Sequence, residues 1–237
     1  MIKFAVALTA VLALPPASAA AAVPKTANAS RNWVRQVVMT PDGGFRMGNP
    51  AARVAVVEYG SLACPHCRHF EETGYKPLQQ YVASGAVSYE FRNLLLNGPD
   101  IAVSLLTRCA GARNFFPMTE LVYARQPQWE DKIQRAVAGL SDAQKAEMDK
   151  MTDQQRIARF AAFGDLQQLG ANFGVTPARA RQCLSDPQAL KRLLGVTQAA
   201  NKAGVEHTPT FFINGKVTDA ATWDQLEPLI RQAGARG

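Results

Sequence analysis

The chain has 237 residues, of which 47% are hydrophobic and 19% are charged, with a net charge of +7 and four cysteines. A chain of this length forms one large domain or two modest ones and has enough residues to bury a core. The composition excludes a collagen-like or low-complexity protein, and the net charge is too small for this length to indicate disorder. Four cysteines are too few for a disulfide-dense small protein, so their positions matter more than their number.

The first 19 residues have the pattern of a cleavable signal peptide. Lys3 supplies a positive charge, residues 4–14 are apolar, and Ala17-Ser18-Ala19 provides a cleavage site of small residues. Cleavage slightly later in the alanine-rich stretch is one alternative. An uncleaved anchor is another, although the apolar run is shorter than the roughly 20 residues that span a bilayer. We therefore expect an exported, periplasmic protein, with residues 20–33 as a flexible leader, in a compartment that permits stable disulfides.

The basic residues give no sign of a nucleic-acid partner. The 26 lysines and arginines are scattered along the sequence, without a long basic run or a ladder of basic and aromatic residues. Proteins that bind nucleic acids usually cluster these side chains. We therefore expect a solvated basic surface and no nucleic acid among the partners.

Three strands are expected before the first cysteine. Residues 33–39 and 44–47 have strand patterns and flank the turn sequence Thr40-Pro41-Asp42-Gly43. Residues 54–59 form an almost unbroken apolar run, which is typical of a strand buried on both faces of a parallel sheet.

A helix and a fourth strand follow. The helical pattern runs from Cys64 to about residue 84, with a break expected near Gly74 and Pro77. Residues 87–92 then alternate apolar and polar side chains, as in a half-buried strand. This order predicts two parallel strands joined by a helical crossover.

The pattern from residue 100 to residue 201 is helical only. Four helix starts are marked by N-cap signals: the capping boxes Ser141/Gln144 and Thr152/Gln155, and the capping residues Thr176 and Asp186, each followed by proline.

The strand pattern returns at residues 210–213, followed by the hairpin turn Asn214-Gly215 and a last helix from about residue 222 to residue 231. The sequence thus predicts an α/β domain made of residues 34–99 and 202–237, interrupted by an inserted helical domain of residues 100–201.

The motif Cys64-Pro65-His66-Cys67 follows a predicted buried strand and opens the next helix. Proline suits the first helical position, so Cys64 is the expected N-cap and Cys67 lies one turn into the helix. The Cys64 sulfur then faces unpaired backbone N–H groups and the positive end of the helix dipole, and His66 adds a donor or a positive charge. The pKa of Cys64 should therefore fall well below its ordinary value, while Cys67 stays a thiol. The two sulfurs can form a reversible disulfide.

Two other interpretations of the motif stay open. The pair with the nearby His69 could be half of a zinc site, but a structural site needs four ligands and the other cysteines form no second C-x-x-C motif. An inert structural disulfide is the second interpretation. A redox-active dithiol fits the strand-to-helix position best, and we expect neither a metal nor another cofactor.

Two further features accompany the motif. Glu58 interrupts the apolar strand, where burial would raise its pKa and let it carry a proton to or from Cys67; the alternative is a side chain that reaches solvent near the strand end. Thr208-Pro209 precedes the returning strand. A cis bond there would expose backbone to an incoming extended peptide, whereas a trans bond is the default.

Together these residues and the segment 211–215 resemble the DsbA-like branch of the thioredoxin superfamily, over about residues 34–235. The resemblance implies an α/β protein with a thioredoxin fold and an inserted α-helical domain. It implies that Cys64 is the nucleophile, Cys67 its partner thiol, and Pro209 a cis-proline packed against them with Thr208. By the same resemblance His66 tunes the redox equilibrium and Glu58 is the buried proton carrier.

The resemblance also implies a structural disulfide between Cys109 and Cys183, near the two ends of the helical insertion; two separate buried thiols are the alternative. The implied function is a periplasmic thiol:disulfide oxidoreductase that introduces disulfides into unfolded or reduced exported proteins and is reoxidised by a DsbB-like membrane oxidase. The alternatives are a disulfide isomerase or reductase kept reduced by a membrane partner, and a peptide-binding or chaperone module whose cysteines are incidental.

Overall fold

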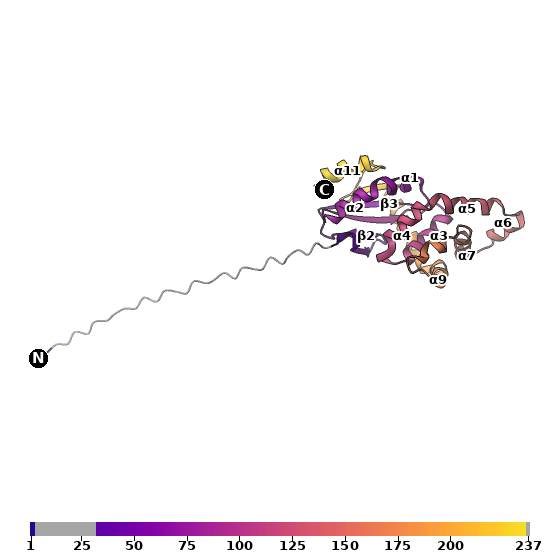
Figure 1. Cartoon of the computed structure of the whole chain (residues 1–237), viewed down its shortest axis with the longest axis horizontal. Helices are drawn as coiled ribbons and strands as arrows, with labels where there is room; N and C mark the ends of the chain where they lie inside the picture. Colours follow the sequence, from indigo (N-terminus) through magenta and orange to yellow (C-terminus); the bar gives the residue numbers. More distant parts are fainter. Residues whose placement is uncertain (3–31, 236–237) are drawn as a thin grey trace. The chain divides into compact units, whose positions relative to one another are not determined.

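The computed structural model describes residues 1–2 and 32–235, so the predicted signal peptide and nearly all of the predicted leader lie outside the described residues. The residues from 32 onward form one compact unit (Figure 1). Its elements in chain order are η1 (Trp33–Arg35), β1 (Val37–Met39), β2 (Phe45–Gly48), β3 (Val54–Gly60), α1 (Pro65–Phe70), η2 (Glu71–Tyr75), α2 (Lys76–Ala83), β4 (Val87–Asn93), α3 (Gly98–Cys109), α4 (Ala112–Ala124), α5 (Gln126–Ala138), α6 (Asp142–Asp149), α7 (Asp153–Phe163), α8 (Leu166–Ala171), α9 (Pro177–Ser185), α10 (Pro187–Lys202), β5 (Thr210–Ile213), β6 (Lys216–Val217) and α11 (Trp223–Gln232).

The six strands form one mixed sheet in the order β1-β2-β4-β3-β5-β6. The neighbours β3 and β4 are parallel, as the predicted crossover requires, and the other neighbouring pairs are antiparallel. The chain leaves β4 into the helices α3–α10 and returns through β5, which pairs with β3. The helical segment is therefore inserted between two strands of the same sheet, and the predicted fold class is confirmed.

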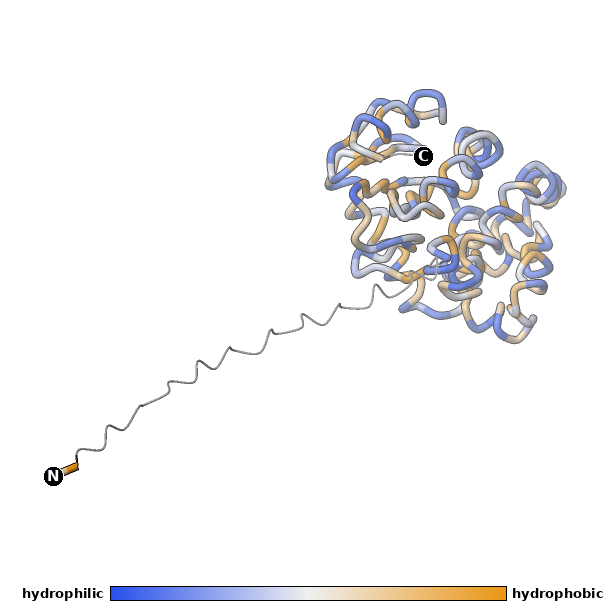
Figure 2. Tube along the Cα trace, turned by 60° about the vertical axis from the view of Figure 1, so that its left-hand side comes forward, coloured by the Kyte–Doolittle hydropathy of each residue, from blue (hydrophilic) through white to orange (hydrophobic). Residues whose placement is uncertain are grey.

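The helical segment shares its apolar core with the sheet. Phe115 of α4 stacks on Phe45 of β2 with ring centroids 3.9 Å apart, and Phe116 lies 5.6 Å from the ring of Tyr89 in β4. Most of the buried hydrophobic side chains of the sheet, of α1 and α2 and of the inserted helices form one cluster. Figure 2 shows hydrophilic residues along the outer turns of the helices. The insertion is thus packed onto the sheet as part of one body.

The helix after Cys64 is not broken near Gly74 and Pro77, so that prediction was wrong. The chain passes from α1 through the π-helical turn η2 into α2 and keeps right-handed helical dihedral angles at the junctions. A Cβ atom at Gly74 would lie 2.8 Å from Phe70 and 2.9 Å from Trp223. The glycine is therefore explained by the close approach of α11, because a side chain there would collide with its first residue.

Two strand predictions also need correction. Strand β4 is buried on both faces and not half-buried, because its polar residues have partners: the Glu90 carboxylate accepts hydrogen bonds from Thr40 Oγ1 and Arg92 Nε, each at 2.7 Å. Residues 33–35 form a 3₁₀ turn, η1, and the first strand begins only at Val37. Alternation alone could not reveal that the polar face of β4 is covered.

Local signals in the helical segment and the hairpin are confirmed. Asn214 and Gly215 have φ angles of 50° and 79°, as the predicted hairpin turn requires. The predicted N-cap side chains each accept a hydrogen bond from a backbone N–H in the first helical turn, and the first two complete their capping boxes: Ser141, Thr152, Thr176 and Asp186. These helix starts are therefore encoded locally.

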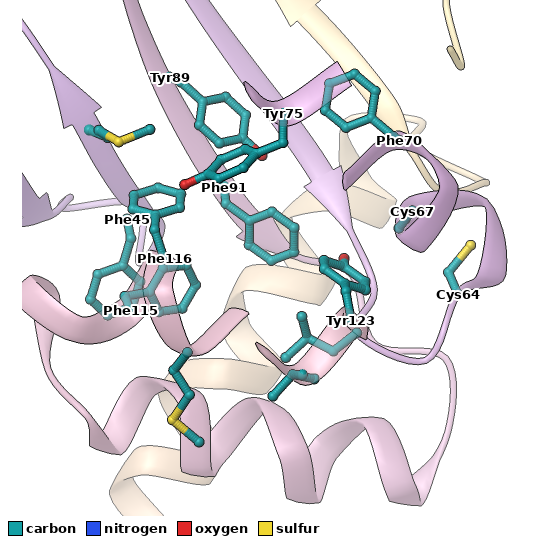
Figure 3. Close-up of a cluster of buried hydrophobic side chains, with 14 of the residues drawn as sticks. Phe45, Cys64, Cys67, Phe70, Tyr75, Tyr89, Phe91, Phe115, Phe116 and Tyr123 are labelled. Carbon is teal, nitrogen blue, oxygen red and sulfur yellow. The ribbon is translucent and has the colours of Figure 1, made fainter. Parts of the chain in front are cut away.

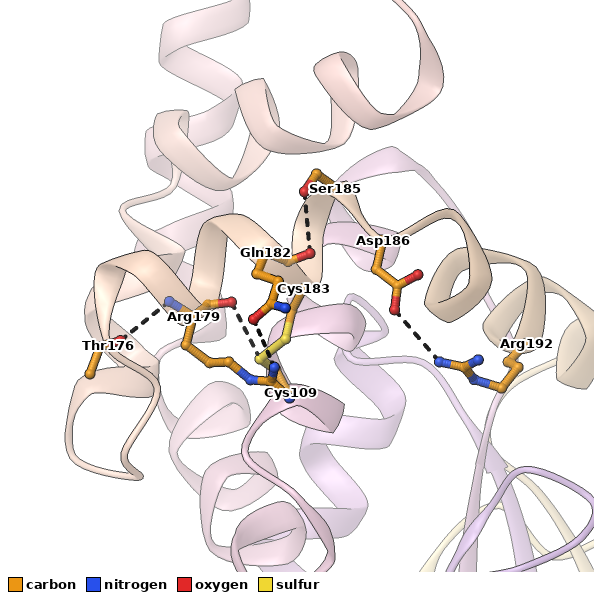
Figure 4. The surroundings of a disulfide bond; sticks show 8 residues. All are labelled: Cys109, Thr176, Arg179, Gln182, Cys183, Ser185, Asp186 and Arg192. Carbon is orange, nitrogen blue, oxygen red and sulfur yellow. Dashed lines mark hydrogen bonds and ion pairs between the residues drawn. A yellow bond between two sulfur atoms is a disulfide. The ribbon is translucent and has the colours of Figure 1, made fainter.

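Cys109 at the end of α3 and Cys183 in α9 form a disulfide with an S–S distance of 2.00 Å (Figure 4). The bond joins residues 74 positions apart and ties α9 to α3. On the chain-entropy model, closing a loop of this length stabilises the fold by at most about 4–5 kcal/mol.

Among the described residues, no helix is both long and apolar enough to cross a membrane.

Candidate active site

The sheet topology brings the two halves of the candidate site together. Strand β3 ends at Gly60, shortly before Cys64, and β5 begins directly after Pro209, with Tyr59 opposite Thr210 in an antiparallel pair. The end of one strand and the start of an antiparallel neighbour lie at the same edge of a sheet. As a result, Cys64 Sγ lies 3.4 Å from the carbonyl oxygen of Thr208, and the Thr208–Pro209 peptide bond is cis.

The C-x-x-C motif occupies the first turn of α1. Helix α1 begins at Pro65, with Cys64 as its N-cap in an extended conformation and Cys67 one turn further along. Figure 3 shows both cysteines at this end of the helix. Both cysteines are thiols in this structure and both are buried, with exposed fractions of 4% for Cys64 and 1% for Cys67. The structure therefore represents the dithiol form.

The two sulfurs have opposite acidities. The pKa of Cys64 is lowered to about 5, mainly by the hydrogen bond with the Cys67 thiol, and further by the Thr208 side chain and by backbone N–H groups of Cys67 and His66. Burial opposes this effect without cancelling it. Burial raises the pKa of Cys67 well above its ordinary value. At neutral pH the pair therefore holds one thiolate, on Cys64, and one thiol, on Cys67.

His66 acts on this site through its backbone. Its N–H group helps to lower the pKa of Cys64, while its side chain is exposed at the surface. No hydrogen bond joins the imidazole to Cys64 in the part of the chain that the structure describes. The expected hydrogen bond from the His66 ring to Cys64 is thus not seen. The expected backbone N–H donors at the helix N-terminus are present.

Glu58 is buried beneath the motif, with 2% of its surface exposed, so the alternative that it reaches solvent was wrong. Burial raises its pKa to about 8, while a hydrogen bond from Tyr89 Oη to Glu58 Oε2, 2.6 Å long, opposes the shift and the Cys64 charge adds to it. The charge of Glu58 in turn raises the pKa of Cys67. A carboxyl that is mostly protonated at pH 7 beside a buried thiol can exchange a proton with it.

The inserted helices hold the loop that carries Cys64. Gln126 Nε2 at the start of α5 donates hydrogen bonds to the carbonyl oxygens of Leu62, at 2.8 Å, and of Cys64, at 3.2 Å. Tyr123 Oη at the end of α4 donates to the carbonyl oxygen of Ser61, at 3.1 Å. These contacts fix the backbone immediately before α1.

Asp100, in the first turn of α3, also holds the loop before α1. Its carboxylate accepts hydrogen bonds from Ser61 Oγ at 2.6 Å and from the Leu62 backbone N–H at 3.2 Å. Burial raises its pKa to about 6, and these hydrogen bonds limit the increase. Sequence reasoning missed Asp100, Tyr123 and Gln126, because polar residues inside a helical pattern carry no signal that they face a loop far away in the sequence.

The fold and the site define a protein of the thioredoxin type: a C-x-x-C motif at a helix N-terminus faces a cis-proline at the edge of a mixed sheet. The family model described as Thioredoxin matches residues 40–232, and the chain belongs to this family. In this chain the helices α3–α10 are inserted between strands β4 and β5.

Proteins with known names and structures agree with this assignment. A Rickettsia bellii protein named as a candidate protein-disulfide oxidoreductase is 28% identical over 190 residues, which cover 79% of this chain and 63% of that protein. The chain thus spans less than two thirds of that relative. The crystal structure of a protein-disulfide isomerase from Novosphingobium aromaticivorans matches with a TM-score of 0.71 and 29% identity, over 80% of this chain and 96% of that one. The fold of Wolbachia pipientis alpha-DsbA1 matches with a TM-score of 0.60 and 20% identity, over 83% and 93%.

Replacing Gln126 by Ala tests the contact between the inserted helices and the loop. The substitution removes the side-chain donor of the buried Leu62 carbonyl and one of the two donors of the Cys64 carbonyl, so we expect the free energy of unfolding to fall by about 1–3 kcal/mol. We also expect the pKa of Cys64 to rise, because its backbone is no longer held at the helix start; ultraviolet thiolate absorbance measures it. Gln128→Ala, at an exposed position on the same helix, is the matched control. An unchanged pKa in Gln126→Ala would show that the contact does not position Cys64.

Replacing Glu58 by Gln tests the buried carboxyl. Its pKa of about 8 in the folded protein lies above the ordinary value of 4.5, so the unfolded chain loses this proton first as the pH rises. The group's contribution to stability is therefore complete below pH 4.5 and is lost between there and pH 8. We expect the stability of Glu58→Gln relative to wild type to increase over this interval by several kcal/mol. Urea denaturation of both dithiol forms measures the difference, and a difference independent of pH would contradict the raised pKa.

Proposed function

We propose that this protein is a thiol:disulfide oxidoreductase of the DsbA type that introduces disulfides into exported proteins in the periplasm. The observation that carries the proposal is the opposite acidity of the two sulfurs of one C-x-x-C motif, with the pKa of Cys64 lowered to about 5 and that of Cys67 raised. A stabilised Cys64 thiolate favours the dithiol form. The disulfide form is therefore a good oxidant, and Cys64 is a good leaving group.

The first step consumes the Cys64–Cys67 disulfide. A client thiolate attacks Cys64 Sγ, the bond to Cys67 breaks, and Cys67 leaves with the bonding electron pair. Cys67 then takes a proton, for which Glu58 is the donor, since its carboxyl is mostly protonated at neutral pH. The product is a mixed disulfide between Cys64 and the client.

The second step releases the client. A second client thiolate attacks the client sulfur of the mixed disulfide, a client disulfide forms, and Cys64 departs as a thiolate that needs no proton. The client has lost two electrons and the enzyme has gained them. The protein is left in the dithiol form that the structure shows, with Cys64 and Cys67 free.

Thr208 and Pro209 are the proposed client-binding residues, because they face Cys64 at the start of β5. Backbone at this position can pair with an extended client segment. The proposed partners are unfolded or reduced exported proteins and a DsbB-like membrane oxidase that takes the electrons from the dithiol. His66, exposed beside Cys64, is placed to modulate the redox equilibrium.

A disulfide isomerase or reductase is the second candidate. The name of the Novosphingobium aromaticivorans structure, a protein-disulfide isomerase at 29% identity, favours it. The same Cys64 thiolate would then attack a client disulfide, and a membrane partner would keep the motif reduced. The two candidates share every residue of the site and differ in the form of the motif that the cell maintains.

The oxidised protein, mixed with a reduced two-cysteine peptide, tests the proposal in a single turnover. We expect the wild type to convert the peptide to its disulfide. We expect Cys64→Ser and Cys67→Ser to lose this activity, because neither variant can form the Cys64–Cys67 disulfide. Mass spectrometry after acid quenching follows each species. The double variant Cys109→Ser/Cys183→Ser is the matched control and should still oxidise the peptide. Oxidation by Cys64→Ser would rule out the proposed chemistry.

A further inference from the structure

A cavity of about 340 Å³ lies beside the loop that carries Cys64, and no step of the proposed reaction uses it. Its lining includes Ala63, the residue before Cys64, together with side chains from α5 and from the start of α3. Trp129 and Ile133 of α5 form buried parts of its wall, and a hydrogen bond from Trp129 Nε1 to the Val122 carbonyl oxygen, 3.1 Å long, fixes the ring. This α5 cavity is therefore already formed in the dithiol protein, next to the reactive cysteine.

Glu130 is the one charged residue in the described lining of the α5 cavity. It lies one helical turn after Gln126, on the face of α5 that holds the Cys64 carbonyl group. Burial raises the pKa of the Glu130 carboxyl to about 7; the charge of Arg68 opposes this shift, and the charges of Asp100 and Cys64 add to it. The carboxyl group is therefore within electrostatic reach of the Cys64 sulfur.

The other charged residues of α5 have partners, whereas Glu130 forms no hydrogen bond or ion pair with the described part of the chain. Asp131 pairs with Arg135 at 2.6 Å, and Lys132 pairs with Asp165 at 2.6 Å. A partly buried carboxylate without a partner has lost hydration that nothing replaces, so a cation from another molecule would be bound favourably there.

Arg68 does not serve as that cation, although its charge acts on Glu130. Its Nε atom donates to Gln126 Oε1 at 3.2 Å, and its Nη1 atom donates to Glu72 Oε1 at 2.6 Å. The guanidinium group is therefore already bound by two other side chains, and the place beside Glu130 is open to a ligand.

The α5 cavity matches the chemistry of a long basic side chain. Lysine and arginine bury their aliphatic stems along apolar surface and keep the charged end in a polar environment. Pro99, Trp129 and Ile133 provide apolar wall for the stem, and Glu130 provides the opposite charge for its end. An acidic side chain would be repelled by Glu130 and by the Cys64 thiolate, and an apolar one would leave the carboxylate unpaired. The net charge of +7 disfavours basic peptides at long range, so a preference for them has to come from such a local contact.

A bound client places its own side chains near this cavity. Its cysteine is joined to Cys64 in the mixed disulfide, and its backbone lies along the proposed binding segment Thr208-Pro209. An extended chain advances about 3.3 Å per residue, so side chains within a few positions of the client cysteine can reach the cavity beside Ala63.

We propose that the α5 cavity is a subsite for a lysine or arginine side chain close in sequence to the reacting cysteine of the client, and that Glu130 selects this side chain. The inference rests on the proposed function and adds a substrate class to it: reduced exported proteins with a basic residue near the cysteine. Glu130 binds the client and takes no part in the exchange of electrons.

Paired peptides test the subsite. Reduced two-cysteine peptides carry either lysine or the neutral norleucine, at successive positions on either side of the first cysteine, and are mixed with the oxidised protein in a stopped-flow instrument. At the position that reaches the cavity, we expect the wild type to react roughly 3–10-fold faster with the lysine peptide, and Glu130→Gln to react equally fast with both. The ratio within each variant cancels any effect of the substitution on Cys64 itself. A structural role of Glu130 would slow both peptides alike.

Asp131→Asn is the matched control, because it removes the same charge from the neighbouring residue of α5, which is paired with Arg135; it should keep the lysine preference. Glu130→Lys should instead favour a peptide with glutamate over one with glutamine. Equal wild-type rates with lysine and norleucine at every position would overturn the inference, and so would a lysine preference that persists in Glu130→Gln; both results leave the proposed function standing. A wild type that oxidises none of the peptides would overturn both.

Discussion

The stabilisation of the Cys64 sulfur at the N-terminus of α1 is the interaction on which the rest of the site depends. A thiolate there is favoured by the Cys67 thiol, by the Thr208 side chain and by backbone N–H groups at the helix start. None of these donors is effective unless the backbone of residues 61–64 is fixed. Strand β3 leads into this segment, and Asp100, Tyr123 and Gln126 of the inserted helices hold it by hydrogen bonds. The insertion is therefore part of the site and not an appendage.

The same arrangement has a cost in stability. Glu58 is buried with a pKa of about 8, and Cys67 is buried with a pKa well above its ordinary value. Each of these groups favours its neutral form in the folded protein, so the interior becomes less favourable as the pH rises. Active sites commonly hold groups with shifted pKa values for their chemistry. The shared aromatic core of β2, β4 and α4 and the disulfide between α3 and α9 offset part of this cost.

Much of the fold could be predicted from the sequence, because its signals are local. The N-cap at Cys64, the N-caps at Ser141 and Thr152, and the Asn214-Gly215 turn each depend on a few adjacent residues. The failures came from long-range packing. Gly74 suggested a break because its tight contact with α11 is invisible in the sequence, and β4 seemed half-buried because the partner of Glu90 lies 50 residues away.

The candidate site follows the same division. The motif Cys64–Cys67, Glu58 and Thr208-Pro209 stood out because their residue types are unusual at their positions. Gln126 did not, since a glutamine at a helix start is ordinary. Only its hydrogen bonds to the carbonyl oxygens of Leu62 and Cys64 distinguish it.

The central claim is that a stabilised Cys64 thiolate makes the Cys64–Cys67 disulfide oxidising. The most direct measurement is an equilibrium titration of this couple against reduced and oxidised glutathione, in which the fraction of protein in the dithiol form is measured. The account predicts a potential nearer to about −120 mV, as in DsbA-type oxidants, than to about −270 mV, as in thioredoxin. A couple as reducing as thioredoxin would contradict the account and would favour a reductase or isomerase.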